Sequence, residues 1–316
     1  MRAAVLGIGV CLVAAAAWSA ERHTVRKPGR SLDGMWTTNS LTSFERPEEL
    51  KSLVLSEEQA AAYELKHRGK PPPIPDDVLG AAESEWWETD VGLGRVRGRP
   101  RSSWIVSPAD GQVPFTAQAK AANKARREQG KTNFDHPEAR PRGERCLETG
   151  GPPLEGGAYN TGFKIVQAPG AVAIFTEWMN AVRVVRLDGG AHPPRAVRFL
   201  SGDSVGRWEG DTLVVETTNF APEVVNAANG DAQADMRVVE RFRRLSPVEL
   251  HYEFFISNPA RYAQPIQGEM VFAATRAPIF EFACHEGNYS LRHALAGGRQ
   301  SDAAAPGGSA AASIAP

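Results

Sequence analysis

The sequence lacks the short motifs that mark nucleotide-dependent enzymes and the common metal sites. It contains no G-x-G-x-x-G after an apolar run, no phosphate loop, no H-E-x-x-H, no C-x-x-C pair and no Asp-rich calcium loop. No unit recurs at a fixed spacing, which argues against a repeat architecture. We therefore expect a protein that uses neither a cofactor nor a metal ion.

An excess of charge of either sign is also missing. The chain has 36 Lys and Arg against 37 Asp and Glu, a net charge of −1, so nothing favours nucleic acid as a partner. Basic residues do gather between positions 91 and 145, among Pro and Gly. They form no regular basic face. We therefore interpret this region as a solvated, irregular wrap with a short helix near residues 117–129, rather than as an anion-binding arm.

Long apolar runs are missing except at the start of the chain. Arg2 precedes an apolar stretch, residues 3–17, which is typical of a secretory leader and is short for a membrane span. Small residues favour cleavage after Ala17 or Ala20, so residues 1–20 are expected to be a signal peptide; a retained helix or anchor is the alternative. The mature protein is then periplasmic or secreted and has no stable membrane span.

Cysteine is scarce, with three in the whole chain. Cys11 lies in the leader, which leaves Cys146 and Cys284 in an oxidising compartment. We expect these two to form a disulfide. Two separate thiols, or a catalytic one, are the alternatives, and they are disfavoured because exported proteins seldom keep a reactive thiol reduced.

Composition divides the mature chain into three parts. Residues 21–160 form an N-terminal extension, with a helix that opens at Ser56 and the irregular basic wrap. Residues 161–295 consist of short β-branched and aromatic runs between turn residues, which predicts an antiparallel sandwich or barrel and a mainly β fold. Residues 296–316 are rich in Ala, Gly, Ser and Pro and are expected to be disordered. Strands are expected at 163–167, 171–179, 182–187, 197–199, 204–208, 212–218, 237–245, 250–256, 268–274 and 279–283.

One predicted hairpin permits a statement about the faces of its strands. With residues 246–249 as the turn, Glu240, His251 and Glu253 share one face with aromatic neighbours. Such a face suits a ligand cavity, but it also suits an exposed sheet with cross-strand charge pairs, which is the commoner arrangement. The register behind this expectation pairs Leu245 with Leu250, Arg244 with His251, Phe242 with Glu253 and Glu240 with Phe255.

The stretch that follows Cys284 carries the most chemistry. His285 and Glu286 are suited to proton transfer near neutral pH, and Tyr289 completes the expected catalytic set. Asn288 is expected to hold a substrate oxygen. A disulfide at Cys284 would fix this constellation. The alternative is that these polar groups cap the final strand and satisfy backbone groups.

A second cluster of expected substrate-binding residues lies earlier in the chain. It comprises Tyr159 and Asn160, with Glu177 and Trp178 on the following strand pair. The alternative is that Asn160 makes a turn and Trp178 packs in the core.

Metal and nucleophile sites have weaker support. His251 and Glu253 place two possible ligands on one face of a strand, but no ligand motif accompanies them. Ser204 has the G-x-S-x-G spacing of a hydrolase elbow, yet turn residues follow it where that motif requires a helix. We interpret the segment around Ser204 as a turn.

Several longer motifs together resemble an uncharacterised family of exported bacterial hypothetical proteins. The resemblance runs from about Leu32 to Gly297 and implies no catalytic role, because no activity is established for that family. Separately, residues 33–36 (Asp-Gly-Met-Trp) are similar to the Gly-x-Trp start of lipocalins, although a helix expected soon afterwards does not match that fold. The family motifs are Ser40-Leu-Thr with Glu45-Arg-Pro, Arg145-Cys-Leu with Gly151-Pro-Pro, the stretch 202–220 (GDSVGRWEGDTLVVETTNF) and Cys284-His-Glu-Gly-Asn-Tyr.

These observations support two functions from different classes. The first is an exported, metal-independent acid–base enzyme, an isomerase, lyase or hydrolase that acts on a small organic molecule. The second is a β-barrel carrier that binds a small molecule without chemistry. Polar groups that converge in one closed pocket favour the enzyme, and a deep apolar cavity favours the carrier.

Overall fold

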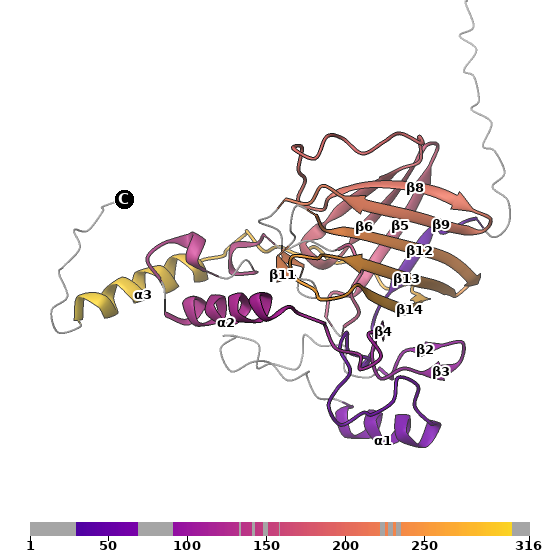
Figure 1. Cartoon of the computed structure of the whole chain (residues 1–316), viewed down its shortest axis with the longest axis horizontal. Helices are drawn as coiled ribbons and strands as arrows, with labels where there is room; N and C mark the ends of the chain where they lie inside the picture. The colour runs from indigo at the N-terminus through magenta and orange to yellow at the C-terminus, as the bar shows by residue number, and fades with distance from the viewer. Residues whose placement is uncertain are drawn as a thin grey trace, which may run out of the picture.

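The chain folds mainly as β-sheet, as the sequence predicts, around a closed barrel of nine strands (Figure 1). The computed structural model describes residues 30–68, 91–132, 134–140, 143–147, 151–157, 159–221, 225–226, 230–231 and 235–304. The expected signal peptide and both cleavage points lie outside the described residues. Within these ranges, none of the helices combines the length and the apolarity that a membrane crossing requires.

The barrel closes because its last strand pairs with its first. The strands follow the order β1, β5, β6, β7, β8, β9, β12, β13 and β14, and β14 then pairs with β1. Neighbours are antiparallel except for β7 and β8, which are parallel. The bounds are β1 Gly34–Thr37, β5 Gly162–Ala168, β6 Ala171–Thr176, β7 Val182–Arg186, β8 Asp203–Glu209, β9 Thr212–Thr218, β12 Arg237–Ser246, β13 Glu249–Ser257 and β14 Ile266–Ala274.

Shorter strands lie outside the closed barrel. β4 (Ile105–Ser107) adds to β14 through Gln267 and Gly268. Two separate pairs are formed by β2 (Arg95–Val96) with β3 (Arg99–Pro100), and by β10 (Val225–Asn226) with β11 (Gly230–Asp231).

Two helices confirm sequence predictions for the extension. α1 (Glu57–His67) begins after Ser56, whose hydroxyl accepts from the Gln59 backbone N–H while the Gln59 side chain accepts from the Ser56 N–H. This reciprocal pair is a capping box, which satisfies two donors at the helix start. α2 (Ala117–Thr132) is the helix expected in the basic wrap.

The C-terminal helix α3 (Ser290–Ala304) contradicts the prediction of disorder for residues 296–304, and residues 305–316 of the expected tail lie outside the described residues. Leu295 is buried, and Gly298 lies so close to Phe134 that a Cβ there would approach the Phe134 side chain to 2.3 Å. This packing gives the Ala-rich segment an apolar contact that its composition did not reveal. In Figure 1, α3 extends away from the barrel. Short 3-10 helices lie at Pro137–Ala139, Gly143–Arg145 and Trp178–Asn180.

Side chains that alternate along the strands fill the barrel. On β13, Leu250, Tyr252 and Ile256 point inward and are completely buried, in line with the period of two that strands impose. Gly268 on β14 leaves room for the ring of Phe254, which a Cβ at this position would overlap. The other large interior side chains are Trp36, Phe163, Ile165, Ile174, Leu213, Phe242, Met270 and Phe272.

The N-terminal segment covers the barrel end at which β1 begins. Trp36 donates from its indole Nε1 to the carbonyl of Leu32 at 3.0 Å. The Arg244 guanidinium lies 4.9 Å from the Trp36 ring centre and donates to the Ser31 carbonyl at 3.0 Å. This cation–π contact and these hydrogen bonds fix the segment across that end.

Three sequence predictions of strand positions and domain limits were wrong. Residues 197–199 form no strand, since only Phe199 makes an isolated bridge, to Phe220. Residues 279–283 also form no strand. The barrel is not confined to residues 161–295, because β1 comes from the extension and closes the barrel.

Candidate functional site

The pairing of β12 with β13 differs from the predicted register by one residue. Glu240 lies opposite Phe254, and His251 lies opposite Arg243. The register shifts between Arg244 and Ser246, so the intervening Leu245 is the extra residue of a bulge. A one-residue slip moves every side chain to the other face. The predicted face that combined Glu240, His251 and Glu253 is therefore wrong, because Glu240 points into the barrel and the other two point outward.

Inside the barrel, Glu240 belongs to a buried polar network. Arg183 on β7 donates to both carboxylate oxygens of Glu240, with 2.8 Å between Nη2 and Oε1. The Tyr252 hydroxyl donates to Glu240 Oε1 at 2.8 Å and accepts from the Leu154 backbone N–H at 2.9 Å. Glu240 is 0% exposed and Arg183 is 7% exposed. Arg183 is thus the charged member of the network nearest to solvent.

Burial and charge fix the protonation state of Tyr252. Burial, followed by the negative charge of Glu240, raises the pKa of Tyr252 well above its ordinary value. Tyr252 is therefore a neutral hydrogen-bond donor near neutral pH. An ion pair in low dielectric needs its remaining hydrogen bonds satisfied, and the hydroxyl of Tyr252 meets that need on the Glu240 side.

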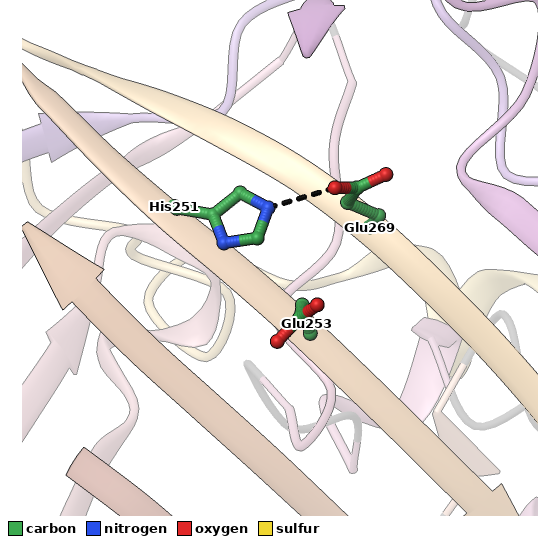
Figure 2. Close-up of side chains that lie close together, drawn as sticks. All are labelled: His251, Glu253 and Glu269. Carbon is green, nitrogen blue, oxygen red and sulfur yellow. Dashed lines mark hydrogen bonds and ion pairs between the residues drawn. The ribbon is translucent and has the colours of Figure 1, made fainter. Parts of the chain in front are cut away.

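On the outer wall, His251 and Glu253 meet a third side chain, Glu269 on β14 (Figure 2). His251 Nε2 lies 2.9 Å from Glu269 Oε1, and Arg101 Nη2 lies 2.7 Å from Glu269 Oε2. The hydrogen bond from His251 and the charge of Arg101 lower the pKa of Glu269 against the opposing effect of burial. His251 is buried on this face, whereas the Glu253 side chain is 45% exposed.

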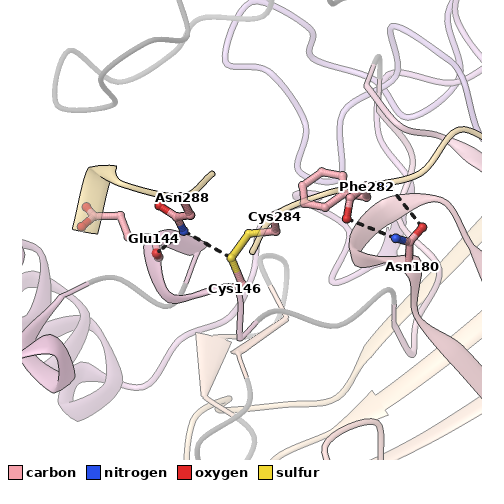
Figure 3. The surroundings of a disulfide bond; sticks show 6 residues. All are labelled: Glu144, Cys146, Asn180, Phe282, Cys284 and Asn288. Carbon is pink, nitrogen blue, oxygen red and sulfur yellow. Dashed lines mark hydrogen bonds between the residues drawn. A yellow bond between two sulfur atoms is a disulfide. The ribbon is translucent and has the colours of Figure 1, made fainter. Parts of the chain in front are cut away.

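The predicted disulfide is present. Cys146 and Cys284 are bonded, with their α-carbons 5.9 Å apart, so the prediction from cysteine count is confirmed (Figure 3). The Asn288 amide donates to the Glu144 carbonyl at 3.3 Å and lies 3.5 Å from the Cys146 sulfur. Asn288 therefore connects the segment after Cys284 to the segment that contains Glu144 and Cys146.

The residues of the predicted catalytic set lie at the surface. His285 and Glu286 are exposed, and Tyr289 is 63% exposed. The segment that holds them leads into α3, which extends away from the barrel (Figure 1). The structure does not bring these residues together with Glu240 or His251, and their catalytic role stays a prediction.

The second predicted cluster does come together, and it joins the C-terminal segment. Trp178 lies 6.0 Å from Tyr159 and 4.9 Å from Phe282, measured between ring centres. Glu177, which is buried, accepts from the backbone N–H groups of Gly162 and Phe280, each at 3.2 Å. These contacts tie residues 280–282 to the start of β5.

Two further residues of this region adopt conformations that suit turns. Asn160 has a φ of 48°, in the left-handed region that Asn tolerates in turns. Asn180 exchanges two hydrogen bonds with the backbone of Phe282 (Figure 3).

Sequence reasoning missed a polar cluster on the outside of β8 and β9. His192 Nδ1 lies 2.6 Å from Asp203 Oδ2, and its Nε2 lies 3.5 Å from Glu216 Oε1. Asp203 also accepts from Arg186 at 3.1 Å. Asn219 donates to carbonyls of the loop that carries His192, those of Pro193, Pro194 and Val197.

The signal for this cluster was present in the long motif at 202–220. Two of its four acids, Asp203 and Glu216, lie near each other on the outer face of one hairpin. Through these hydrogen bonds the cluster holds the loop of residues 187–200 against the outer face of the barrel. Ser204, within the same motif, lies in β8 and not in the turn that we expected there, and its hydroxyl shares a hydrogen bond of 2.8 Å with that of Thr217.

Comparison of the chain with protein-family models, with characterised proteins and with solved structures finds no match. The resemblance to an exported bacterial family accordingly stays a prediction. The interior network of Arg183, Glu240 and Tyr252 is the most completely enclosed charged group described above.

Proposed function

We propose that the protein is a β-barrel binding protein that holds a small organic molecule through an acceptor oxygen, with Arg183 as the binding group. The observation that carries this proposal is the setting of Arg183. Its guanidinium faces the interior and is anchored by the fully buried Glu240, and the Arg183 side chain keeps a residual exposure of 7%. An arginine has five N–H donors, and Glu240 takes only one from each terminal nitrogen.

Stability alone is a poor reason to bury such a pair. Replacing a buried ion pair with apolar side chains of similar volume is often neutral or stabilising, because the desolvation penalty offsets the attraction. Binding gives the pair a role, since Glu240 and Tyr252 hold the guanidinium in place before a ligand arrives. A preorganised donor loses less conformational entropy on binding.

The interior limits both the size of the ligand and its position. The Tyr252 ring lies 4.9 Å from the rings of Phe242 and Phe272, and Phe163 lies 4.9 Å from Phe272. These rings fill the barrel beyond the network. The ligand therefore sits at the end where β7 begins and is small, with a carbonyl or carboxylate oxygen directed at Arg183.

The same geometry favours binding over proton transfer. Near neutral pH Tyr252 keeps its proton, and the two oxygens of Glu240 already accept from Arg183 and Tyr252. His251 points to the outer face. We therefore place the carrier before the acid–base enzyme among the two functions.

The acid–base enzyme is the second candidate, with His285, Glu286 and Tyr289 as its working groups. The disulfide at Cys284 supports it, because it anchors the segment on which these residues lie. Their exposure weighs against it. For either function the disulfide also supports export to an oxidising compartment.

Three six-carbon probes test the binding proposal: hexanoate, 2-hexanone and hexylammonium. They share an apolar body and differ in whether they offer a charged acceptor, a neutral acceptor or only donors. We expect hexanoate or 2-hexanone at saturation to raise the thermal midpoint by about 2 °C or more, through preferential binding to the folded state. Hexylammonium is expected to leave it unchanged. Equal shifts for all three probes, or a shift for hexylammonium alone, contradict the proposal.

A further inference from the structure

We propose that His251, Glu253 and Glu269 form a binding site for a divalent transition-metal ion such as Zn²⁺ on the outer wall of the barrel. One nitrogen or oxygen atom from each of the three side chains lies within 4.8 Å of the others. Imidazole nitrogen and carboxylate oxygen are the donors that Zn²⁺ accepts in three-ligand sites that keep a position for water. The site lies on the outer face of the sheet, whereas Glu240 on β12 points into the barrel. The metal site therefore does not depend on the proposed ligand site.

Strand geometry brings the three donors together. His251 and Glu253 are two residues apart on β13 and therefore share a face, and Glu253 lies directly opposite Glu269 on β14. Figure 2 shows the three side chains gathered over the two strands. Donors on two paired strands are held by backbone hydrogen bonds, and a site on such a scaffold is more precise than one on loops.

The distances leave room for an ion after small side-chain rotations. Zinc bonds of about 2.0–2.2 Å place two tetrahedral donors about 3.3–3.5 Å apart. His251 Nε2 and Glu269 Oε1 are 2.9 Å apart, and the complete set lies within 4.8 Å. The ion takes the place of the hydrogen that joins His251 to Glu269, and any proton released goes to solvent. The partly exposed carboxylate of Glu253 closes the site from the solvent side.

Neighbouring charges define the outer shell. Arg101 holds Glu269 Oε2 and leaves Oε1 directed at His251, which is how outer hydrogen bonds orient ligating carboxylates. Arg241 Nε lies 3.8 Å from Glu253 Oε2. These two arginines weaken affinity for a dication relative to an all-acidic site. A bound ion would in turn relieve the repulsion between Glu253 and Glu269, which oppose each other across the strands.

Titration of the protein with Zn²⁺, followed by calorimetry, tests the site. Co²⁺ provides an optical readout, because its visible absorption reports nitrogen and oxygen coordination. Glu253→Gln removes one ligand at a partly exposed position and should leave the fold intact. Glu249→Gln is the matched control, since Glu249 is an exposed residue on the same strand and face. His251→Asn removes the nitrogen donor, and its thermal midpoint is measured to confirm folding.

We expect one equivalent of Zn²⁺ to bind the wild-type protein. Glu253→Gln should weaken binding by about tenfold or more, and His251→Asn should weaken it further and abolish the Co²⁺ absorption. Glu249→Gln should match the wild type. The proposal is overturned if no saturable binding occurs, or if Glu253→Gln binds Zn²⁺ with unchanged affinity and stoichiometry.

Discussion

Arg183 on β7 and Glu240 on β12 form a two-point ion pair across the inside of the barrel, with 2.8 Å between Nη2 and Oε1. These strands are separated by β8 and β9 in the sheet order, so the pair crosses the interior and does not run along the wall. Removing one partner leaves the other charge buried without compensation, which makes the pair a sensitive probe of the interior.

A double-mutant cycle measures this coupling. Arg183→Met alone should lower the free energy of unfolding by about 3–5 kcal/mol, because Glu240 is left buried and unpaired. Arg183→Met combined with Glu240→Gln should lose less than the two single changes together. Urea unfolding gives the values.

The exposed pair formed by Arg207 and Glu209 provides the control for this cycle. Removing that pair should leave the free energy of unfolding almost unchanged, because both side chains are exposed and solvent screens their attraction. If Arg183→Met costs no more than this surface change, the buried network does not have the described geometry.

Alkaline pH should destabilise the protein through Tyr262. Burial is the main reason that the pKa of Tyr262 lies above its ordinary value. Because its pKa is raised in the folded state, Tyr262 contributes its full share to the free energy of unfolding below the unfolded pKa of about 10. This contribution declines as the pH rises toward the folded pKa, by at most about 1.4 kcal/mol per pH unit. Urea unfolding at several pH values from about 8 to about 11, a range that spans the ordinary tyrosine pKa, measures the slope. Tyr262→Phe should make it shallower, and an unchanged slope contradicts this assignment.

Loss of the disulfide should destabilise the C-terminal segment more than it destabilises the barrel. Cys146 and Cys284 are 138 residues apart, and closing a loop of that length is worth about 5 kcal/mol by chain entropy. Cys146→Ala with Cys284→Ala should therefore lower the free energy of unfolding by about 2–5 kcal/mol. Hydrogen exchange should rise in α3 more than in β12 and β13. Equal exchange increases in the strands and in α3 would show that the bond stabilises the barrel directly.

His285→Ala separates the two candidate functions. His285 is exposed, so this change should alter the free energy of unfolding by about 0.5 kcal/mol or less. Under the binding proposal it also leaves hexanoate affinity unchanged. A loss of any measured turnover with stability intact would instead favour the acid–base enzyme.

The sequence predicted features that depend on local chemistry. The helix cap at Ser56 follows from residues three apart, which form the reciprocal hydrogen bonds of a capping box. The disulfide follows from cysteine count and compartment. Each of these features depends on only a few residues and does not depend on how the strands are aligned with one another.

Features that depend on strand register or on the pairing of distant strands were missed. The bulge at Leu245 adds one residue, and that single residue reverses the faces of β12 relative to β13. On β7, Val182 and Val184 are exposed while Arg183 points inward, which inverts the usual rule for apolar side chains. Only the position of Glu240, brought close by the closed sheet, makes an inward arginine favourable.

Calorimetric titration with hexanoate of the double variant Arg183→Met/Glu240→Gln tests the central claim most directly. The variant removes both charges together, so that no unpaired charge remains, and the amide oxygen introduced by Glu240→Gln still offers Tyr252 an acceptor. Arg207→Gln/Glu209→Gln serves as the matched surface control. The account predicts that the interior variant binds hexanoate about tenfold more weakly or worse, as expected when a charged hydrogen bond is lost, while the control matches the wild type. Equal affinity in all three proteins would contradict it.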